Sequence, residues 1–173
     1  MGASCPLVDN LFPGDGIDLG VIAKDGYVHV WNSSRTEVWT SPDQVDTSGN
    51  NTLSCADIDN RGGLQIVAPA SSPALYAYGY HTSSDTTLKP LAGWHVATPT
   101  YGFDKVAAAL GDANLDGTTK VIAGDLSCFV NCWNASGDAT IPTGAANGAL
   151  WRQVTENQGT SIVNSSVAIG DIN

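Results

Sequence analysis

The chain has 173 residues, about the length of one domain, and 42% of them are hydrophobic, which is enough to build a core. It carries 17 acidic and 7 basic residues, so its net charge is −10, and 15 of the acids are Asp. Asp and the 19 Gly favour turns over helices, which excludes a helical bundle or a coiled coil. The acidic balance argues against nucleic acid or an anionic membrane surface as partner, and no apolar run reaches the roughly 18 residues of a membrane-spanning helix.

In chain order, short apolar runs alternate with turns. The first unit contains a run from Tyr27 to Trp31 after the turn Lys24-Asp25-Gly26. The third unit contains four runs, at residues 106–110, 120–123, 129–133 and 151–154. Such runs between Gly-Asp, Asp-Gly and Asn-Ala-Ser-Gly turns predict β-strands. The longer polar stretches 41–51, 81–91 and 138–147 predict surface loops.

A tandem repeat organises these strands. A leading acid recurs at Asp57, Asp112 and Asp171, with spacings of 55 and 59 residues, and a degenerate copy ends at Asp9. Other markers keep the same phase, namely Val21–Ala23, Ile66–Ala68 and Val121–Ala123, then Trp31, Tyr78 and Trp133, then Trp39, Trp94 and Trp151. Since all markers keep their order, the chain is built of similar units. A Trp required in every unit indicates packing between units rather than sugar stacking.

Four short strands in each unit are typical of a β-propeller blade. We predict an all-β fold in which residues 1–173 form one segment of four-stranded antiparallel blades. The blades cover approximately residues 5–52, 53–105 and 106–165, and residues 166–173 begin a fourth. Closed propellers need roughly four to eight blades, so further blades are expected from a longer chain or from other copies.

One acidic loop has a pattern suited to a metal ion. The segment Asp112-Ala-Asn114-Leu-Asp116-Gly117 places oxygen side chains at positions 1, 3 and 5 and a Gly at position 6. Alternating oxygens on a tight loop converge on one point, and hard oxygen ligands suit calcium. An EF-hand is excluded because its position 12 would be Glu and is Ala123 here. The alternative is a hairpin turn held by Asx hydrogen bonds, without metal.

With its flanking strands, this loop resembles the FG-GAP or VCBS repeat, which builds propellers of the integrin α-chain type. The resemblance is best from Lys105 to Gly137 and covers nearly the whole chain. It implies calcium in the loop between the first two strands of a blade. The implied ligands are the side chains of Asp112, Asn114 and Asp116 and the carbonyl of Thr118. Similar repeats occur in secreted bacterial proteins, fungal lectins and rhamnogalacturonan lyases.

The sequence departs from this pattern at several positions. The family usually has an acid at position 9 of the loop, where this chain has Lys120. The second unit has Arg61 at position 5, whose guanidinium can replace a cation, and Gln65 at position 9. The first unit retains only Asp9, Asp15 and Asp18, and the last stops at Asp171 and Asn173. We therefore expect one calcium site, at Asp112, and a metal-free turn at Asp57.

The cysteines and sequons allow more than one interpretation. Cys5 and Cys55 occupy strand positions and indicate small core residues. Cys128 and Cys132 would lie about 13 Å apart on an extended strand, so a disulfide between them requires a bulge or a turn. His29, His81 and His95 show no metal-ligand spacing. Sequons begin at four residues, where glycosylation and turn chemistry are both consistent with the pattern: Asn32, Asn50, Asn134 and Asn164.

Three functions are consistent with this sequence. The first is an extracellular or cell-surface, calcium-stabilised FG-GAP/VCBS-type propeller module for adhesion, recognition or assembly, with a protein or glycan ligand and no catalytic role. The first ten residues show no signal peptide. The alternatives are a segment of a carbohydrate-active enzyme resembling rhamnogalacturonan lyase, and a glycosylated structural subunit of a fibre or sheath.

Overall fold

The computed structural model describes residues 6–12, 16–47, 50–71, 74–80, 85–97, 102–103, 106–113, 115–126, 129–136, 151–154 and 167–169, of which 95–97 and 151–154 are described by their backbone. Within this part of the chain all regular structure is β-strand. The strands are β1 Leu7–Asp9, β2 Asp18–Ile22, β3 Val28–Trp31, β4 Glu37–Thr40, β5 Ser54–Ala56, β6 Gln65–Pro69, β7 Ala74–Gly79, β8 Lys89–Ala97, β9 Ala109–Gly111, β10 Lys120–Gly124, β11 Phe129–Trp133 and β12 Trp151–Val154.

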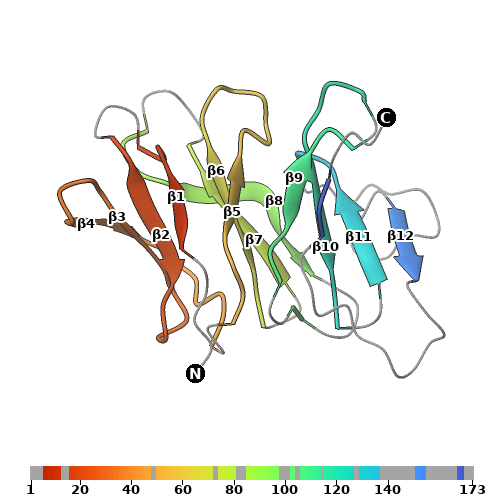
Figure 1. The fold of residues 1–173 in the computed structure, drawn as a ribbon, viewed down its shortest axis with the longest axis horizontal. Helices are drawn as coiled ribbons and strands as arrows, with labels where there is room; N and C mark the ends of the chain where they lie inside the picture. Colours follow the sequence, from red (N-terminus) through yellow and green to blue (C-terminus); the bar gives the residue numbers. More distant parts are fainter. Residues whose placement is uncertain are drawn as a thin grey trace.

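The strands form three antiparallel four-stranded sheets, each with its strands in chain order. We name them blade 1 (β1–β4), blade 2 (β5–β8) and blade 3 (β9–β12). Figure 1 shows them side by side, with β1, β5 and β9 as neighbouring first strands, in agreement with the contacts of β5 with both β1 and β9. The all-β blade architecture predicted from the repeat is confirmed, and each sheet lies within one predicted unit.

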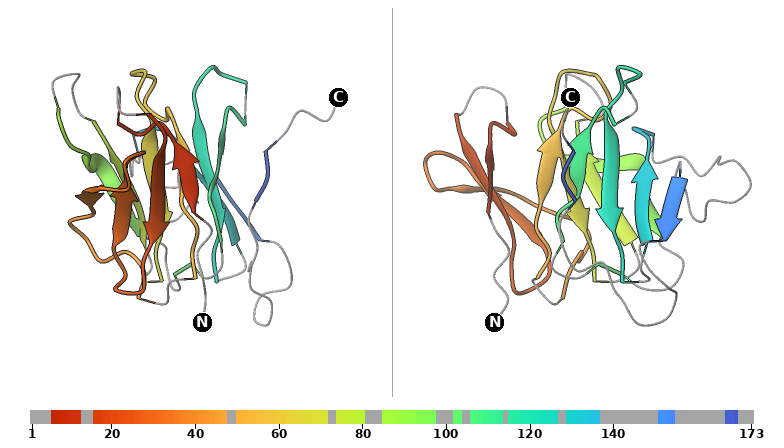
Figure 2. Two further views of the ribbon diagram at one scale, coloured as in Figure 1. Left: turned by 60° about the vertical axis from the view of Figure 1, so that its left-hand side comes forward. Right: turned by 45° about the vertical axis from the view of Figure 1, so that its right-hand side comes forward.

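Burial along the strands follows from this arrangement. In blade 1, β2 and β3 alternate between buried and more exposed residues, as expected for a sheet covered on one face. All five residues of β6 are buried, because blade 2 lies between two other sheets. All five residues of β10 are buried as well. Figure 2 shows from two further directions how the sheets stand against one another.

The core consists mainly of two apolar layers between adjacent blades. One layer joins Val28, Val30 and Trp39 of blade 1 to Ile66 and Tyr78 of blade 2. The other layer joins blades 2 and 3 and includes Val67, Leu75, Ala77, Trp94, Val121, Ala123 and Trp133. In each layer a Trp of the outer strand donates from Nε1 to a carbonyl of the next blade, Trp39 to Leu88 (3.0 Å) and Trp94 to Ala135 (2.8 Å). These contacts confirm the predicted packing role of both residues.

The predicted surface loops are partly wrong. In the connection from blade 1 to blade 2, Val45, Asp46 and Asn51 are buried rather than exposed. The side chain of Asn51 is fully buried and bridges two backbone groups near blade 3, donating to the Phe103 carbonyl (3.0 Å) and accepting from the Val106 amide (3.3 Å). Buried backbone groups need hydrogen-bond partners, and the side chain of Asn51 supplies them here.

The loop predicted at 81–91 ends earlier than expected, because β8 begins at Lys89. Leu88, just before β8, is buried rather than exposed, and its carbonyl accepts the hydrogen bond from Trp39. Residues 81–84 and 138–147 lie outside the described part of the chain. The strands predicted at 120–123, 129–133 and 151–154 are confirmed by β10, β11 and β12.

The two described cysteines are free thiols in the core. Burial, followed by the hydrogen bond to Asp9, raises the pKa of the Cys55 thiol to about 12. Burial raises the pKa of Cys132 to about 11, against the lowering effect of Lys120. Both thiols therefore stay protonated at neutral pH. Cys5 and Cys128 lie outside the described residues, so the predicted alternative of a Cys128–Cys132 disulfide involves a residue that the structure does not describe.

Candidate functional site

The predicted metal loop lies between β9 and β10, and its counterpart between β5 and β6 stands beside it at the top of Figure 1. In the β9–β10 loop, Asp112 accepts hydrogen bonds from the amides of Asp116 (3.0 Å) and Gly117 (2.7 Å). Asp57 makes the same two bonds to the amides four and five residues later, at 3.1 and 2.8 Å. The position-1 carboxylate therefore holds the turn in both loops, as predicted for Asp57.

The two loops also share a backbone conformation that only certain residues favour. Asn60 and Leu115, both at position 4, have φ angles of 59° and 57°. Gly62 and Gly117, both at position 6, have φ angles of 82° and 80°. Asn tolerates the left-handed region much better than Leu does. The side chain of Leu115 is also 91% exposed, so no packing compensates for its backbone strain.

Exchanging the residues at position 4 is expected to shift stability in opposite directions. Leu115→Asn should raise the free energy of unfolding by about 0.5–1 kcal/mol because it relieves left-handed strain without removing a packed side chain. Asn60→Leu should lower it by about 1 kcal/mol. Urea denaturation followed by circular dichroism measures both. A loss of stability in Leu115→Asn would contradict the strain argument.

Lys120, the first residue of β10, turns its side chain into the loop. Its Nζ lies 2.8 and 3.0 Å from the two carboxylate oxygens of Asp116 and 3.1 Å from the carbonyl of Thr118, and it also donates to the Thr118 hydroxyl. The residue is only 3% exposed. A buried ammonium must be paired and hydrogen-bonded, and here its partners among the described residues come from positions 5 and 7 of the loop.

Gln65, the first residue of β6, occupies the equivalent position in blade 2 and is also buried. Its Nε2 donates to the Gly63 carbonyl (2.7 Å) and to Asp59 Oδ1 (3.2 Å), while its Oε1 accepts from the Ile58 amide (2.6 Å). Gly63 is position 7 of its loop, as Thr118 is in blade 3. The two side chains therefore play the same structural role, donating to the position-7 carbonyl and to a loop carboxylate.

Asp18, the first residue of β2, is the blade 1 counterpart. Its Oδ2 accepts from the amides of Leu11 (2.7 Å) and Phe12 (2.9 Å), and its buried Oδ1 has no hydrogen-bond partner among the residues that the structure describes. Each of these three residues begins the second strand of its blade, and we name them the closing residues: Asp18, Gln65 and Lys120. They are an anion, a neutral amide and a cation in one structural position.

The described donors do not fit a calcium ion as they stand. The ammonium of Lys120 contacts both Asp116 and the Thr118 carbonyl, two of the implied ligands, and the carboxylate of Asp112 is engaged by backbone amides. Among the described residues, no three His, Cys, Asp or Glu are grouped so as to hold a metal. Asn114 lies outside the described residues. Calcium at Asp112, Asn114, Asp116 and Thr118 stays a prediction from the resemblance.

The loops of blades 2 and 3 are joined to each other. The hydroxyl of Thr119 donates to the Asp57 carbonyl (3.0 Å), and Asn60 Nδ2 donates to the Gly117 carbonyl (3.3 Å). The predicted counter-charge at Arg61 forms an ion pair with Asp59, with Nε 3.6 Å from Oδ2. Its side chain is 64% exposed, so this pair contributes only about 0–1 kcal/mol.

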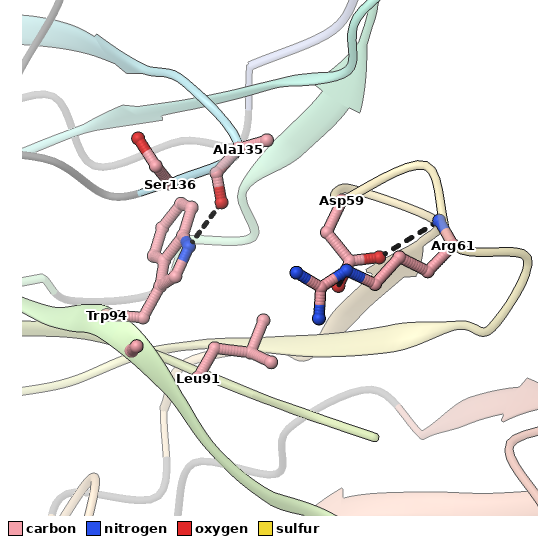
Figure 3. A pocket seen from close by; sticks show the side chains of 7 residues that line it. Asp59, Arg61, Leu91, Trp94, Ala135 and Ser136 are labelled. Atoms are coloured by element: carbon pink, nitrogen blue, oxygen red, sulfur yellow. Dashed lines mark hydrogen bonds and ion pairs between the residues drawn. The ribbon is translucent and has the colours of Figure 1, made fainter. Parts of the chain in front are cut away.

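A pocket of about 470 Å³ opens beside these loops, between blades 2 and 3. Figure 3 shows Leu91 and Trp94 on one side of the pocket and the pair Asp59 and Arg61 on the other. The indole of Trp94 is buried and bonded to the Ala135 carbonyl, so it is not free to stack on a ligand. The pocket is a gap at the joint between two blades, lined by one ion pair, by Ser136 and by apolar residues.

The outward face of blade 1 is the largest departure from the packing of the other blades. In β2 and β3 the outward residues alternate with fully buried ones, and in β1 Val8 lies between two partly buried residues. We name the five outward residues, which point away from blade 2, the open face: Val8, Leu19, Val21, His29 and Trp31. The strand register aligns Val8 with Leu19, Leu19 with Trp31, and Val21 with His29. Val8 is 59% and Leu19 41% exposed, and the other three are partly exposed.

The same register places the counterparts of these residues in the interblade layers. In blade 2 they are Cys55, Ile66, Ala68, Tyr76 and Tyr78, which pack against blade 1. In blade 3 they are Leu110, Val121, Ala123, Asn131 and Trp133, all but Asn131 in the layer against blade 2. The open face therefore has the pattern of a blade-packing surface, but it lacks a covering sheet among the described residues. The prediction that Trp31 packs between blades is therefore wrong for the described part of the chain, where Trp31 lies on the open face and stacks on His29.

An ion cluster lies on the open face. His29 Nδ1 is 2.7 Å from Glu37 and Nε2 is 3.1 Å from Asp25, and the imidazole stacks on Trp31 with ring centroids 5.6 Å apart. Burial lowers the pKa of His29, but the hydrogen bonds and charges of the two carboxylates outweigh it, so the pKa lies above its usual value. The Tyr27 amide, with His29, lowers the pKa of Asp25. The prediction that His29 is an ordinary strand residue agrees with this arrangement.

The described sequon residues take part in turns. Asn32 accepts from the amides of Ser34 (3.1 Å) and Thr36 (3.0 Å), and Asn134 accepts from the Ser136 hydroxyl (2.8 Å). The backbone amide of Asn50 bonds to Asp46. These contacts support the turn interpretation, while glycosylation stays a prediction, and Asn164 lies outside the described residues.

Sequence reasoning missed the open face and the inward direction of the closing residues. Aligning the repeats by register, rather than by the leading Asp alone, would have paired Leu19 with Ile66 and Val121 and indicated a face without a partner.

Comparisons with known proteins support the fold alone. No family profile matches the chain, and no curated protein matches it in sequence. Among solved structures, the chain is similar to the β-propeller BBS1N, crystallised in complex with ARL6DN and soaked with lead, with a TM-score of 0.55 and 14% identity. The match covers 79% of this chain and 41% of that chain. No described segment forms a helix long and apolar enough to cross a membrane. The fold is that of a partial β-propeller.

Proposed function

We propose that this chain is part of an FG-GAP/VCBS-type propeller that works as a recognition and assembly module rather than as a catalyst, outside the cell or at its surface. The open face is the observation that carries the proposal. The partner it fits is a further blade, because in blades 2 and 3 the same register positions are covered by a neighbouring four-stranded sheet.

The physical argument rests on the apolar surface that the open face leaves uncovered. Val8 and Leu19 are among the few large hydrophobic residues with high exposure in the described chain. They lie side by side in the sheet with Val21, His29 and Trp31. Covering such side chains stabilises a contact by about 25 cal/mol for each Å² of apolar surface removed from water. An apolar, regularly spaced strand surface is suited to another sheet.

The comparison supports a protein as partner. The similar propeller BBS1N was crystallised in complex with ARL6DN. Propellers present loops and blade faces to such partners without needing catalytic groups. The extracellular location and the FG-GAP/VCBS type rest on the resemblance of the Asp112 loop and its flanking strands.

The test of assembly through the open face uses the 173-residue chain itself. Each copy carries four-stranded blades, so a blade of a second copy can cover the open face of the first. We expect concentration-dependent association, measured by size-exclusion chromatography with light scattering up to about 100 µM. The double variant Val8→Thr/Leu19→Thr should shift the population to monomer, since Thr keeps the strand but removes the apolar surface.

The control is Leu115→Asn, which removes a more exposed leucine far from the open face. It should associate as the wild type does. A wild-type chain that is monomeric over the whole concentration range would contradict the proposal. Equal loss of association in Leu115→Asn would contradict the assignment of this face.

A further inference from the structure

Lys120 occupies the position that the resemblance gives to a metal ligand, yet it carries a positive charge. Position 9 of the β9–β10 loop would supply an acid to a bound cation, and its side chain would point at positions 5 and 7. The side chain of Lys120 does point there, with its Nζ 2.8 Å from Asp116 Oδ1 and 3.1 Å from the Thr118 carbonyl. The geometry of a cation site is therefore present, and an ammonium is at its centre.

The chemistry of the ammonium matches these partners. A lysine ammonium has three N–H donors and no acceptor. Around Lys120 Nζ lie both carboxylate oxygens of Asp116, the carbonyl of Thr118 and its hydroxyl, all of them acceptors. A divalent ion placed among the same oxygens would lie against this buried positive charge, and like charges at short range repel strongly away from water.

Blade 2 shows what this position does when no charge is present. Gln65 donates from Nε2 to the position-7 carbonyl of Gly63 and to the Asp59 carboxylate. At positions 4 and 6 its loop has nearly the same φ angles as the loop of blade 3, and its leading Asp accepts the same two hydrogen bonds from backbone amides. The first residue of the second strand therefore donates into this loop in blade 2 as well, with a neutral amide in place of the ammonium.

We propose that Lys120 is the built-in cation of the β9–β10 loop, which closes through the Lys120 ammonium on Asp116 and Thr118 and needs no calcium. This inference does not depend on the proposed function, because it concerns how one loop is held.

The first test measures the melting temperature of the wild type in calcium chloride and in EDTA, with magnesium chloride as a further control. We expect the same melting temperature in all three. Isothermal titration of calcium into the protein checks for binding directly. A rise in melting temperature with calcium that disappears in Asp116→Asn would overturn the proposal, since a ligand of the native state must stabilise it.

The second test exchanges Lys120 itself. Lys120→Gln copies the closing residue of blade 2 and should fold without calcium dependence. Lys120→Met has a side chain as long as that of Gln but donates no hydrogen bond, so it should melt below Lys120→Gln by about 3–8 °C. If Lys120→Met and Lys120→Gln melt together, the donor role of Lys120 is wrong.

Lys120→Asp restores an acid at position 9. Without calcium it should melt below the wild type, because three carboxylates then share the loop without a cation. Added calcium should raise its melting temperature by at least about 3 °C, while magnesium, which demands stricter geometry, should raise it less. If the Lys120→Asp variant folds and calcium does not change its melting temperature, the idea that the ammonium stands in the place of a metal ion is wrong. The wild-type and Lys120→Gln measurements decide the proposal if this variant does not fold.

Discussion

Trp133→Ala is expected to lower the free energy of unfolding by about 3–5 kcal/mol, the usual cost of removing a buried Trp. Trp133 is 1% exposed and lies in the layer between blades 2 and 3, together with Val121 and Ala123. Its removal leaves a cavity at the centre of that layer, and the blades on either side cannot both move in to fill it. Urea denaturation followed by Trp fluorescence and circular dichroism measures the loss.

Trp31→Ala is the matched control, because Trp31 has the same register position in blade 1. Its side chain lies on the open face, where it stacks on His29 and touches no second sheet among the described residues. The expected loss is about 1 kcal/mol, from the stacking and partial burial alone. Equal losses in the two variants would show that the open face is already covered and would remove the basis for a docking surface there.

Asn51→Ala is expected to destabilise the chain by about 2–4 kcal/mol, because it leaves the Phe103 carbonyl and the Val106 amide without their partner. Asn51 is fully buried where the blade 1–blade 2 connection meets the blade 2–blade 3 connection, so water cannot replace the lost bonds readily. The side chain joins segments more than 50 residues apart, which makes it a tie between blades rather than a local turn residue. Thermal and urea denaturation measure the change.

Asn50→Ala serves as the neighbouring control and also removes a sequon. The amide of Asn50 bonds to Asp46 through its backbone, which Ala retains. We expect a loss of about 1 kcal/mol or less. A larger loss in Asn50→Ala than in Asn51→Ala would contradict the assignment of the interblade tie to Asn51.

The repeat was sufficient to predict the blades because its markers are residues that the fold uses in every unit. Trp39 and Trp94 recur in phase since each packs onto the next blade and donates to its backbone. Asp57 and Asp112 recur since each carboxylate holds the same turn. A residue type that is needed for a fixed geometry leaves a periodic trace in the sequence, and that trace predicts both sheet and loop.

The closing residues left no such trace. A lysine at the start of a strand normally indicates a solvent-facing side chain, and the pattern around Lys120 contains nothing to show that it turns inward. The same holds for Asn51, which looks like a loop residue because its partners lie near residues 103 and 106, far along the chain. Side-chain direction and long-range pairing depend on the assembled blades, so they could not be predicted from local composition.

The apolar layers between consecutive blades couple each blade to the next one. A blade that packs against two neighbouring blades is therefore held more firmly than a blade that packs against one. Blade 2 is clamped from both sides, by the indole of Trp39 on one and by that of Trp94 and the hydroxyl of Ser54 on the other. Blade 1 is clamped from one side only in the described chain. Blade 3 likewise packs on only one neighbouring sheet there. Spontaneous opening should therefore begin at the end blades, β1–β4 or β9–β12, and the amides of β6 and β7 should exchange their hydrogens with solvent most slowly.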